Sequence, residues 1–187
     1  MHNRKILIIG EVYVDQHLDI IENGYSTSRL GGIFHAARSC DALNIEYALA
    51  YYAPDYLVKD VEKFGIDVLR ASSIFRLGKV DKAPNVMLIG QSDESGNQLY
   101  ENILGRQAEY VSMLPFMQVL DDFDPTDIII FPGRYGNAGI LSNLSNYEGK
   151  IHIDMNYDCD DILDLDTIKI QTCLLYTSDA ADDLIGV

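Results

Sequence analysis

A carboxylate and a pair of glycines have the clearest capacity for binding chemistry in this sequence. Asp15 lies a few residues beyond an apolar run, and Gly31 and Gly32 precede a segment with helical spacing. A carboxylate at a strand end can accept hydrogen bonds from two neighbouring hydroxyl groups. Glycines at a helix start let a ligand approach the backbone and its N–H donors. These residues predict a site for a small hydroxylated ligand, and an acidic loop residue beside an ordinary turn is the alternative.

His35 follows the two glycines and falls in the first turn of the same expected helix. An imidazole can donate or accept a hydrogen bond, so His35 can supply a polar contact to the same ligand. A partly buried helix histidine whose ring is satisfied within the protein is the alternative interpretation.

Other catalytic and metal-binding patterns are missing from the sequence. It contains no GxxxxGK[ST], GxGxxG, GxSxG or HExxH motif. Asp154, Asn156 and Asp158 have the spacing that opens a calcium loop. However, Cys159 stands where that loop needs glycine, and Leu165 where it needs a bidentate glutamate. We therefore predict no metal ligands, and we interpret the glycine-rich residues 133–139 as a turn between a strand and a helix.

Strands that alternate with helices must position these side chains. Continuous apolar runs and helical spacing predict a parallel, doubly wound α/β sheet with ligands at the carboxyl ends of its strands. A polar, glycine-containing connection indicates a hairpin that interrupts this alternation and forms a small β appendage. The expected strands are 5–9, 47–52, 127–131, 150–154 and 167–172, with a broken β stretch at 67–77; the hairpin is 85–90 with 98–102; the helices are 33–43, 54–64 (stopped by Gly65), 111–123 and 136–146, with a short turn at 161–163.

Composition narrows the function classes. The 187 residues include 29 acidic and 14 basic side chains, a net charge of −15. That charge argues against binding to nucleic acid and to anionic membranes. No apolar run reaches the length of a membrane span, and the apolar stretch near the N-terminus is too short for a signal peptide. Three cysteines without CxxC spacing favour reduced thiols and a cytoplasmic location, with Cys40 in the core.

The sequence of residues 173–187 is unlike that of the rest of the chain. Residues 173–187 resemble a translated sequencing adapter, so we exclude them from the fold as a non-native tail; a genuine C-terminal helix is the alternative. The expected natural part is 1–172, the N-terminal portion of a longer protein.

The order of these motifs resembles the PfkB (ribokinase-like) carbohydrate kinases. The matching features are the Gly-Glu-x-x-x-Asp strand end at 10–15, the Gly-Gly helix start, the hairpin, and Asp154-Met155-Asn156 after a later strand. The resemblance spans most of residues 5–170. It implies a truncated ribokinase-like fold whose lid comes from about 16–30 and 73–106.

The resemblance also implies roles for individual residues. Asp15, Gly31 and Gly32 correspond to residues that bind sugar hydroxyls in that family. His35 stands where the family usually has asparagine, which favours an unusual sugar or a non-sugar alcohol. The family's catalytic aspartate and Gly-Ala-Gly-Asp anion hole lie in a later segment, and no such segment precedes residue 172.

The resemblance therefore implies ATP-dependent phosphorylation of a sugar or polyol, with ATP and Mg²⁺ as cofactors of the intact enzyme and no residue here assigned to either. We expect the fragment to be inactive. A homodimer through the lid is the expected assembly. Two other classes stay open: a non-catalytic sugar-binding or oligomerisation module, and another nucleotide-binding α/β enzyme.

Overall fold

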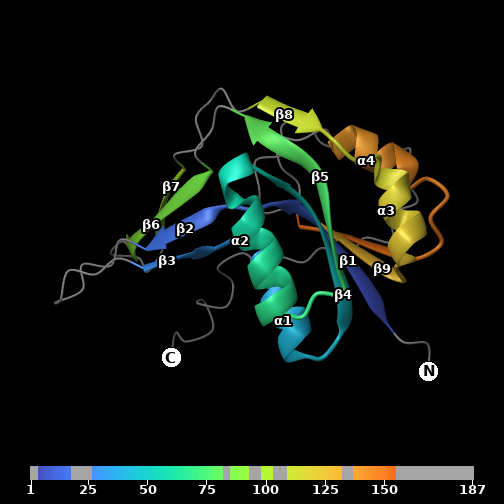
Figure 1. Ribbon diagram of the computed structural model, residues 1–187, viewed down its shortest axis with the longest axis horizontal. Helices are drawn as coiled ribbons and strands as arrows, with labels where there is room; N and C mark the ends of the chain where they lie inside the picture. The colour runs from blue at the N-terminus through green and yellow to red at the C-terminus, as the bar shows by residue number, and fades with distance from the viewer. Residues whose placement is uncertain are drawn as a thin grey trace, which may run out of the picture.

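The computed structural model describes residues 4–17, 27–81, 85–92, 98–102, 109–131 and 137–154. Two β-sheets and four α-helices make up these residues (Figure 1). The strands are β1 (Lys5–Glu11), β2 (Val14–His17), β3 (Thr27–Leu30), β4 (Glu46–Ala53), β5 (Ser73–Asp81), β6 (Val86–Ser92), β7 (Gln98–Asn102), β8 (Glu109–Ser112), β9 (Asp127–Ile130) and β10 (Lys150–Ile153). The helices are α1 (Phe34–Ala42), α2 (Val58–Lys63), α3 (Phe116–Phe123) and α4 (Asn137–Asn143).

The larger sheet has six strands in the order β10-β9-β1-β4-β5-β8. Its first five strands run parallel, and only β8 pairs antiparallel at the edge. β1 lies at the centre because its apolar run is covered on both faces, and Ile6 through Val12 are all buried. The expected α/β fold with a mostly parallel sheet is confirmed.

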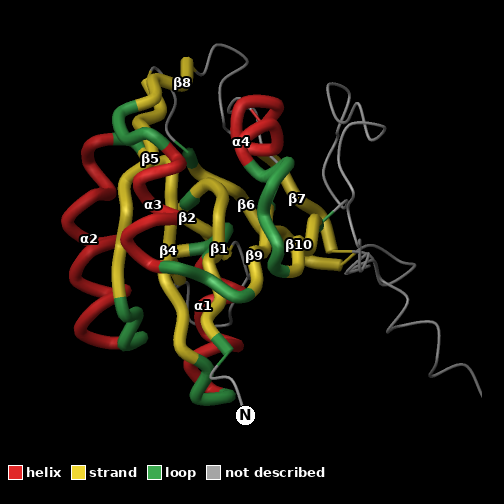
Figure 2. Tube along the Cα trace, turned by 90° about the vertical axis from the view of Figure 1, so that its right-hand side faces the viewer, coloured by secondary structure: helices red, strands yellow, loops and turns green. Residues whose placement is uncertain are grey.

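Helices cover both faces of this sheet. Alternate residues of β1 point to opposite faces, so Leu7 and Ile9 pack with α3 and α4 while Ile6 and Ile8 pack with α1 and α2. Figure 1 shows α3 and α4 together at the right of the sheet, and Figure 2 shows α2 at the side of the sheet away from α4. Cys40 is buried in the α1 layer, as expected from the sequence.

A separate four-stranded sheet, in the order β3-β2-β6-β7, lies beside the main body (Figure 1). β6 and β7 form the expected antiparallel hairpin. The residues expected to form the lid, 16–30 and 73–106, include most of this sheet. β5 falls in the second of these ranges but pairs with β4 in the larger sheet.

Three sequence-based expectations about secondary structure are wrong. The helix expected at 54–64 does not stop at Gly65. A 3₁₀ turn (Asp55–Leu57) precedes α2, and a π-helical turn (Phe64–Val68) that contains Gly65 follows it. A Cβ atom on Gly65 would lie 2.5 Å from Cδ1 of Ile74, so a glycine fits in that turn without displacing this side chain. As a result, the β stretch expected from residue 67 begins only at Ser73.

The helix expected over 111–123 is shorter than predicted. Residues 109–112 form β8 at the edge of the larger sheet, and α3 begins only after Pro115, which has an extended backbone. Proline at a helix start is favourable because its missing N–H needs no partner there. The elements expected at 161–163 and 167–172, the turn at 133–136 and the tail at 173–187 lie outside the described residues.

Candidate functional site

The carboxyl ends of β1, β9 and β10 meet at one edge of the larger sheet, because the three strands are parallel and in register. Two carboxylates are buried at this edge, Glu11 at the end of β1 and Asp154 just after β10. The chain continues from Glu11 into β2, so the four-stranded sheet begins at the same edge. In open α/β sheets, this edge is where ligands bind.

Asp15 lies on β2 and is only 3% exposed. Its Oδ2 atom is 2.9 Å from Nε2 of His35, which comes from the first turn of α1. The same oxygen is 3.6 Å from Nε of Arg29, the residue opposite Asp15 in the β2–β3 pair. The His35 and Arg29 side chains are about half exposed, so they connect the buried carboxylate to the surface.

The glycine pair lies directly against this carboxylate. A Cβ atom on Gly31 would come within 2.1 Å of Oδ1 of Asp15, so no other residue fits there without moving the acid. Gly32 has a φ of +62°, and a Cβ atom on it would lie 2.2 Å from the carbonyl oxygen of Glu11. Glycine adopts this backbone conformation readily, whereas L side chains strain it.

Backbone hydrogen bonds hold the corner in place. The N–H of Gly31 donates to the carbonyl of Tyr13 at 2.9 Å, and the N–H of Ile33 donates to the carbonyl of Glu11 at 3.1 Å. The chain that leaves β1 and the chain that enters α1 are thus joined on both sides of Gly32. The end of β1 and the start of α1 therefore set the position of the glycine pair.

The structure brings together all four residues singled out from the sequence: Asp15, Gly31, Gly32 and His35. Sequence reasoning missed Arg29, because it did not predict that residues 14–17 pair with residues 27–30. The Asn23-Gly24 dipeptide between these two segments was the available sequence signal for a hairpin.

A second polar cluster lies at the opposite, amino-terminal edge of the larger sheet. Arg4 donates two hydrogen bonds to the carboxylate of Asp127 at 2.9 and 3.1 Å. These bonds, with further ones from Thr126 and His152, lower the pKa of Asp127 to about 2. The cluster joins the starts of β1 and β9 and lies far along the strands from Asp15, so we assign it a structural role.

Neither a metal centre nor a membrane span is present within the described ranges. There, no group of three or more His, Cys, Asp or Glu side chains is arranged to hold a metal ion. No helix among the described elements is long and apolar enough to span a membrane. Asp154 is buried at the end of β10, whereas Met155 and Asn156 of the expected Asp-x-Asn motif lie outside the described residues.

Comparison with known proteins gives matches in structure only. No family model and no curated protein matches the sequence. An uncharacterized sugar kinase from Pyrococcus horikoshii matches with a TM-score of 0.54 at 15% identity, over 83% of this chain and 54% of that one. A fructokinase from Xylella fastidiosa matches with a TM-score of 0.60 at 13% identity, over 83% and 51%. A PfkB family carbohydrate kinase from Listeria grayi matches with a TM-score of 0.56 at 13% identity, over 88% and 55%.

The chain has the ribokinase-like fold. It spans about half the length of the solved kinases that it matches. The TM-scores of 0.54 to 0.60 show a shared fold despite identities of 13–15%, and the chemistry must be argued from the site itself.

Proposed function

We propose that this chain provides the acceptor-binding part of an ATP-dependent carbohydrate kinase, whose acceptor is a sugar or a related polyol. The observation that carries the proposal is the buried Asp15 carboxylate packed on the Gly31–Gly32 corner at the ligand-binding edge of a ribokinase-like sheet.

Asp15 would orient the acceptor by accepting hydrogen bonds from its hydroxyl groups. Among the described residues, His35 and Arg29 make their polar contacts with Oδ2 of this carboxylate, so a hydroxyl that approaches Oδ1 displaces neither. The carboxylate itself fills the space that a Gly31 side chain would need, so an acceptor bound to Asp15 would also lie close to the glycine backbone. A charged carboxylate in a site partly shielded from water makes a stronger hydrogen bond to a hydroxyl group than an uncharged oxygen does.

His35 and Arg29 would set which acceptor fits. Each has a half-exposed side chain whose polar end is on Asp15. A neutral imidazole has one N–H and one lone pair, on different ring nitrogens, and Nε2 of His35 already contacts Asp15, so only Nδ1 would remain for the acceptor; an asparagine amide has two N–H donors and a carbonyl oxygen. This difference is the basis for proposing an unusual sugar or a non-sugar alcohol.

The four-stranded sheet would act as a lid over the acceptor, since β2 carries Asp15 and continues away from the larger sheet. Lid closure in a kinase excludes water, so the acceptor hydroxyl rather than water attacks the phosphate. We also propose that lids of two copies pair in a homodimer.

We assign no residue of this chain to the binding site for the phosphate donor or to the catalytic base. The Pyrococcus kinase is also known in complex with ATP, which supports ATP as the donor. Mg²⁺ would accompany the nucleotide and neutralise its phosphates. We propose that the donor site and base are encoded downstream, that the chain alone is inactive, and that the enzyme is cytoplasmic, in keeping with the free thiol of Cys40.

Direct binding tests the proposal without requiring catalysis. The chain is titrated with D-ribose, D-fructose and myo-inositol by isothermal calorimetry, and the tightest acceptor is titrated again into Asp15→Asn. Loss of a hydrogen bond to a charged group costs about 1.5–3 kcal/mol, so binding should weaken about 10- to 100-fold. Asp41→Asn is the matched control, because Asp41 pairs with Arg70, which is not part of the candidate site.

Unchanged affinity in Asp15→Asn, or no binding by any hydroxylated compound, would reject the assigned site. The reading frame beyond residue 172 provides a second test. A Gly-Ala-Gly-Asp-type segment there supports the kinase, whereas an early natural stop supports a non-catalytic binding module.

A further inference from the structure

A cavity of about 480 Å³ lies next to the candidate site but on the other side of the β2–β3 pair. Along each strand, successive side chains point to opposite faces. Asp15 and Arg29 are one cross-strand pair, and Val14 and Leu30 are the next. Val14 and Leu30 line the cavity, whereas Asp15 does not; Arg29 borders both, so the cavity adjoins the candidate acceptor site without including its carboxylate.

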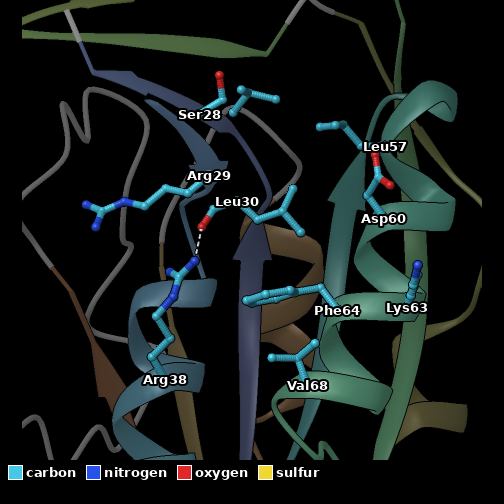
Figure 3. Close-up of a pocket in the computed structure, with 10 residues that line it drawn as sticks. Ser28, Arg29, Leu30, Arg38, Leu57, Asp60, Lys63, Phe64 and Val68 are labelled. Carbon is cyan, nitrogen blue, oxygen red and sulfur yellow. Dashed lines mark hydrogen bonds between the residues drawn. The ribbon is translucent and has the colours of Figure 1, made fainter. Parts of the chain in front are cut away.

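The walls of the cavity are largely apolar. Val14 and Leu30 form the wall on the four-stranded sheet, and Leu57, Phe64 and Val68 form the wall on the α2 side. Figure 3 shows Leu30 and Phe64 pointing toward one another across it. The volume and apolar lining are those of pockets that hold small organic molecules.

The charged residues around the cavity are mostly cationic. Arg29, Arg38 and Lys63 line it, against the carboxylate of Asp60 in the lining and that of Asp15, which pairs with Arg29 behind it, and this leaves a local excess of one positive charge. The whole chain carries a net charge of −15. An excess of positive charge at a hollow in so acidic a protein favours an anionic ligand.

Arg38 is the residue placed to bind that anion. Its Nη2 atom donates a hydrogen bond to the carbonyl of Leu30 at 2.7 Å (Figure 3). Its Nη1 atom is buried and has no hydrogen-bond partner among the residues that the structure describes. The guanidinium carbon lies 5.6 Å from the centre of the Phe64 ring. Arg38 thus presents an unused donor beside an aromatic face.

The surroundings of Arg38 disfavour the charged form of its guanidinium group. Burial lowers the pKa of Arg38, and the positive charge of Arg29 lowers it further, while Asp15 opposes both. A buried donor without a partner costs free energy comparable to a lost hydrogen bond, and more when the group is charged. An anionic group on Nη1 would remove that penalty.

We propose that this cavity binds a small amphipathic carboxylate, with its apolar body between Leu30 and Phe64 and its carboxylate on Nη1 of Arg38. The inference does not rest on the proposed kinase function, since it concerns a different ligand and a different arginine, Arg38, although Arg29 borders both sites.

Two probes of nearly equal shape test it on the whole chain, 4-phenylbutyrate and its neutral amide, 4-phenylbutanamide. Both are titrated by isothermal calorimetry or ligand-observed NMR. The carboxylate should bind at least tenfold more tightly than the amide. Arg38→Gln should reduce that preference to within twofold, and Arg70→Gln, a mostly exposed arginine paired with Asp41, should leave it unchanged.

If Arg38→Gln does not fold, Arg38→Lys replaces it in the test. This variant keeps the positive charge, so it should retain part of the preference for the carboxylate over the amide. Val68→Phe, at an exposed residue of the cavity wall, should weaken both probes by narrowing the cavity. Equal affinity for the two probes overturns the proposal, as does a preference that survives in Arg38→Gln. A dimer in sedimentation experiments that excludes both probes would assign this face to a second copy and overturn it too.

Discussion

Asp15 and the two glycines form a corner in which each residue depends on the others. The acid is buried because it packs on Gly31, and Gly31 tolerates the acid only because it lacks a side chain. Gly32 turns the chain through a left-handed conformation so that α1 begins with His35 facing the acid. The carboxylate is therefore fixed in position before any ligand arrives, which lowers the entropic cost of binding.

Substitution of either glycine should damage this corner. Gly31→Ala places a methyl group within 2.3 Å of three Asp15 atoms, and Gly32→Ala strains a positive φ and meets the Glu11 carbonyl. Each should lower the free energy of unfolding by about 1–3 kcal/mol and abolish acceptor binding. Chemical denaturation and calorimetry measure the two effects.

Gly139→Ala is the matched control, because nothing lies within 4 Å of the added Cβ atom and the residue is in α4. Alanine is favoured over glycine in a helix, so stability should stay equal or rise by up to about 1 kcal/mol. A glycine-pair variant as stable as this control would contradict the packing described for the corner.

Asn85 ties the four-stranded sheet to the loop after β1. It is fully buried, has a φ of +49°, and donates from Nδ2 to the carbonyl of Val12 at 3.1 Å. The main-chain carbonyl of Asn85 accepts a hydrogen bond from the N–H of Val14. We expect Asn85→Ala to destabilise the chain by about 1–3 kcal/mol, because it loses the hydrogen bond and strains the backbone.

Asn85→Gly separates the two causes, since it relieves the backbone strain and still loses the side-chain bond. It should recover part of the stability in thermal or chemical unfolding. Asn44, in the turn after α1, also has a positive φ, and Asn44→Gly should be nearly neutral. Equal stability of Asn85→Ala and the wild type would contradict the anchoring role.

At the scale of elements, the Arg4–Asp127 pair fastens the start of β1 to the start of β9. Hydrogen bonds from Arg4 are the main reason that the pKa of Asp127 falls from its ordinary 3.8 to about 2. A lowered folded-state pKa stabilises the protein above the unfolded value, and that stability is lost as the pH falls from about 4 to about 2. The Asp127 side chain is only 7% exposed, so the contribution at neutral pH is up to about 2 kcal/mol.

Asp127→Asn should remove this contribution and flatten the stability profile between pH 4 and pH 2, measured by urea unfolding at each pH. Asp55→Asn is the control, because Asp55 pairs with Arg76 through a largely exposed side chain and should change stability little. An acid transition of the same shape in Asp127→Asn and the wild type would show that the pair does not stabilise the fold.

At the scale of the molecule, the two sheets differ in how they are buried. β1 and β4 lie inside the larger sheet between two helical layers, and both are buried along nearly their whole length. β2 is half-buried at three of its four residues and pairs within the smaller sheet. Local opening is easiest where few apolar side chains are buried.

We therefore expect amide hydrogen exchange about tenfold or more slower in β1 and β4 than in β2 and β6. A bound acceptor should slow exchange in β2, because Asp15 would then hold a ligand against the strand. Uniform exchange across both sheets, in the free and the bound protein, would contradict a separately opening lid.

Patterns within single segments predicted the central elements correctly. The apolar run at residues 5–9 and the run at 127–131 became β1 and β9, because a strand buried on both faces needs continuous apolar residues. Segments whose structure depends on contacts with other parts of the chain were harder to predict from the sequence. Residues 111 and 112 share the helical spacing of residues 113–123, yet they end β8 because β5 offers an open edge. Likewise, the π-helical turn at Phe64–Val68 is stabilised by packing that no local pattern encodes.

The order of residue types along the chain was sufficient to determine the fold class and to single out Asp15, Gly31, Gly32 and His35, since strand ends and glycine turns are local features. Only the tertiary structure decided that Arg29 shares the acid with His35, because the Asn23-Gly24 turn signal between the two paired strands does not by itself fix which of their residues face each other. It likewise decided that Arg38, with a buried donor that no described residue uses, is among the residues that line an apolar cavity. Contacts between distant residues depend on how complete surfaces pack, and a linear pattern does not contain that information.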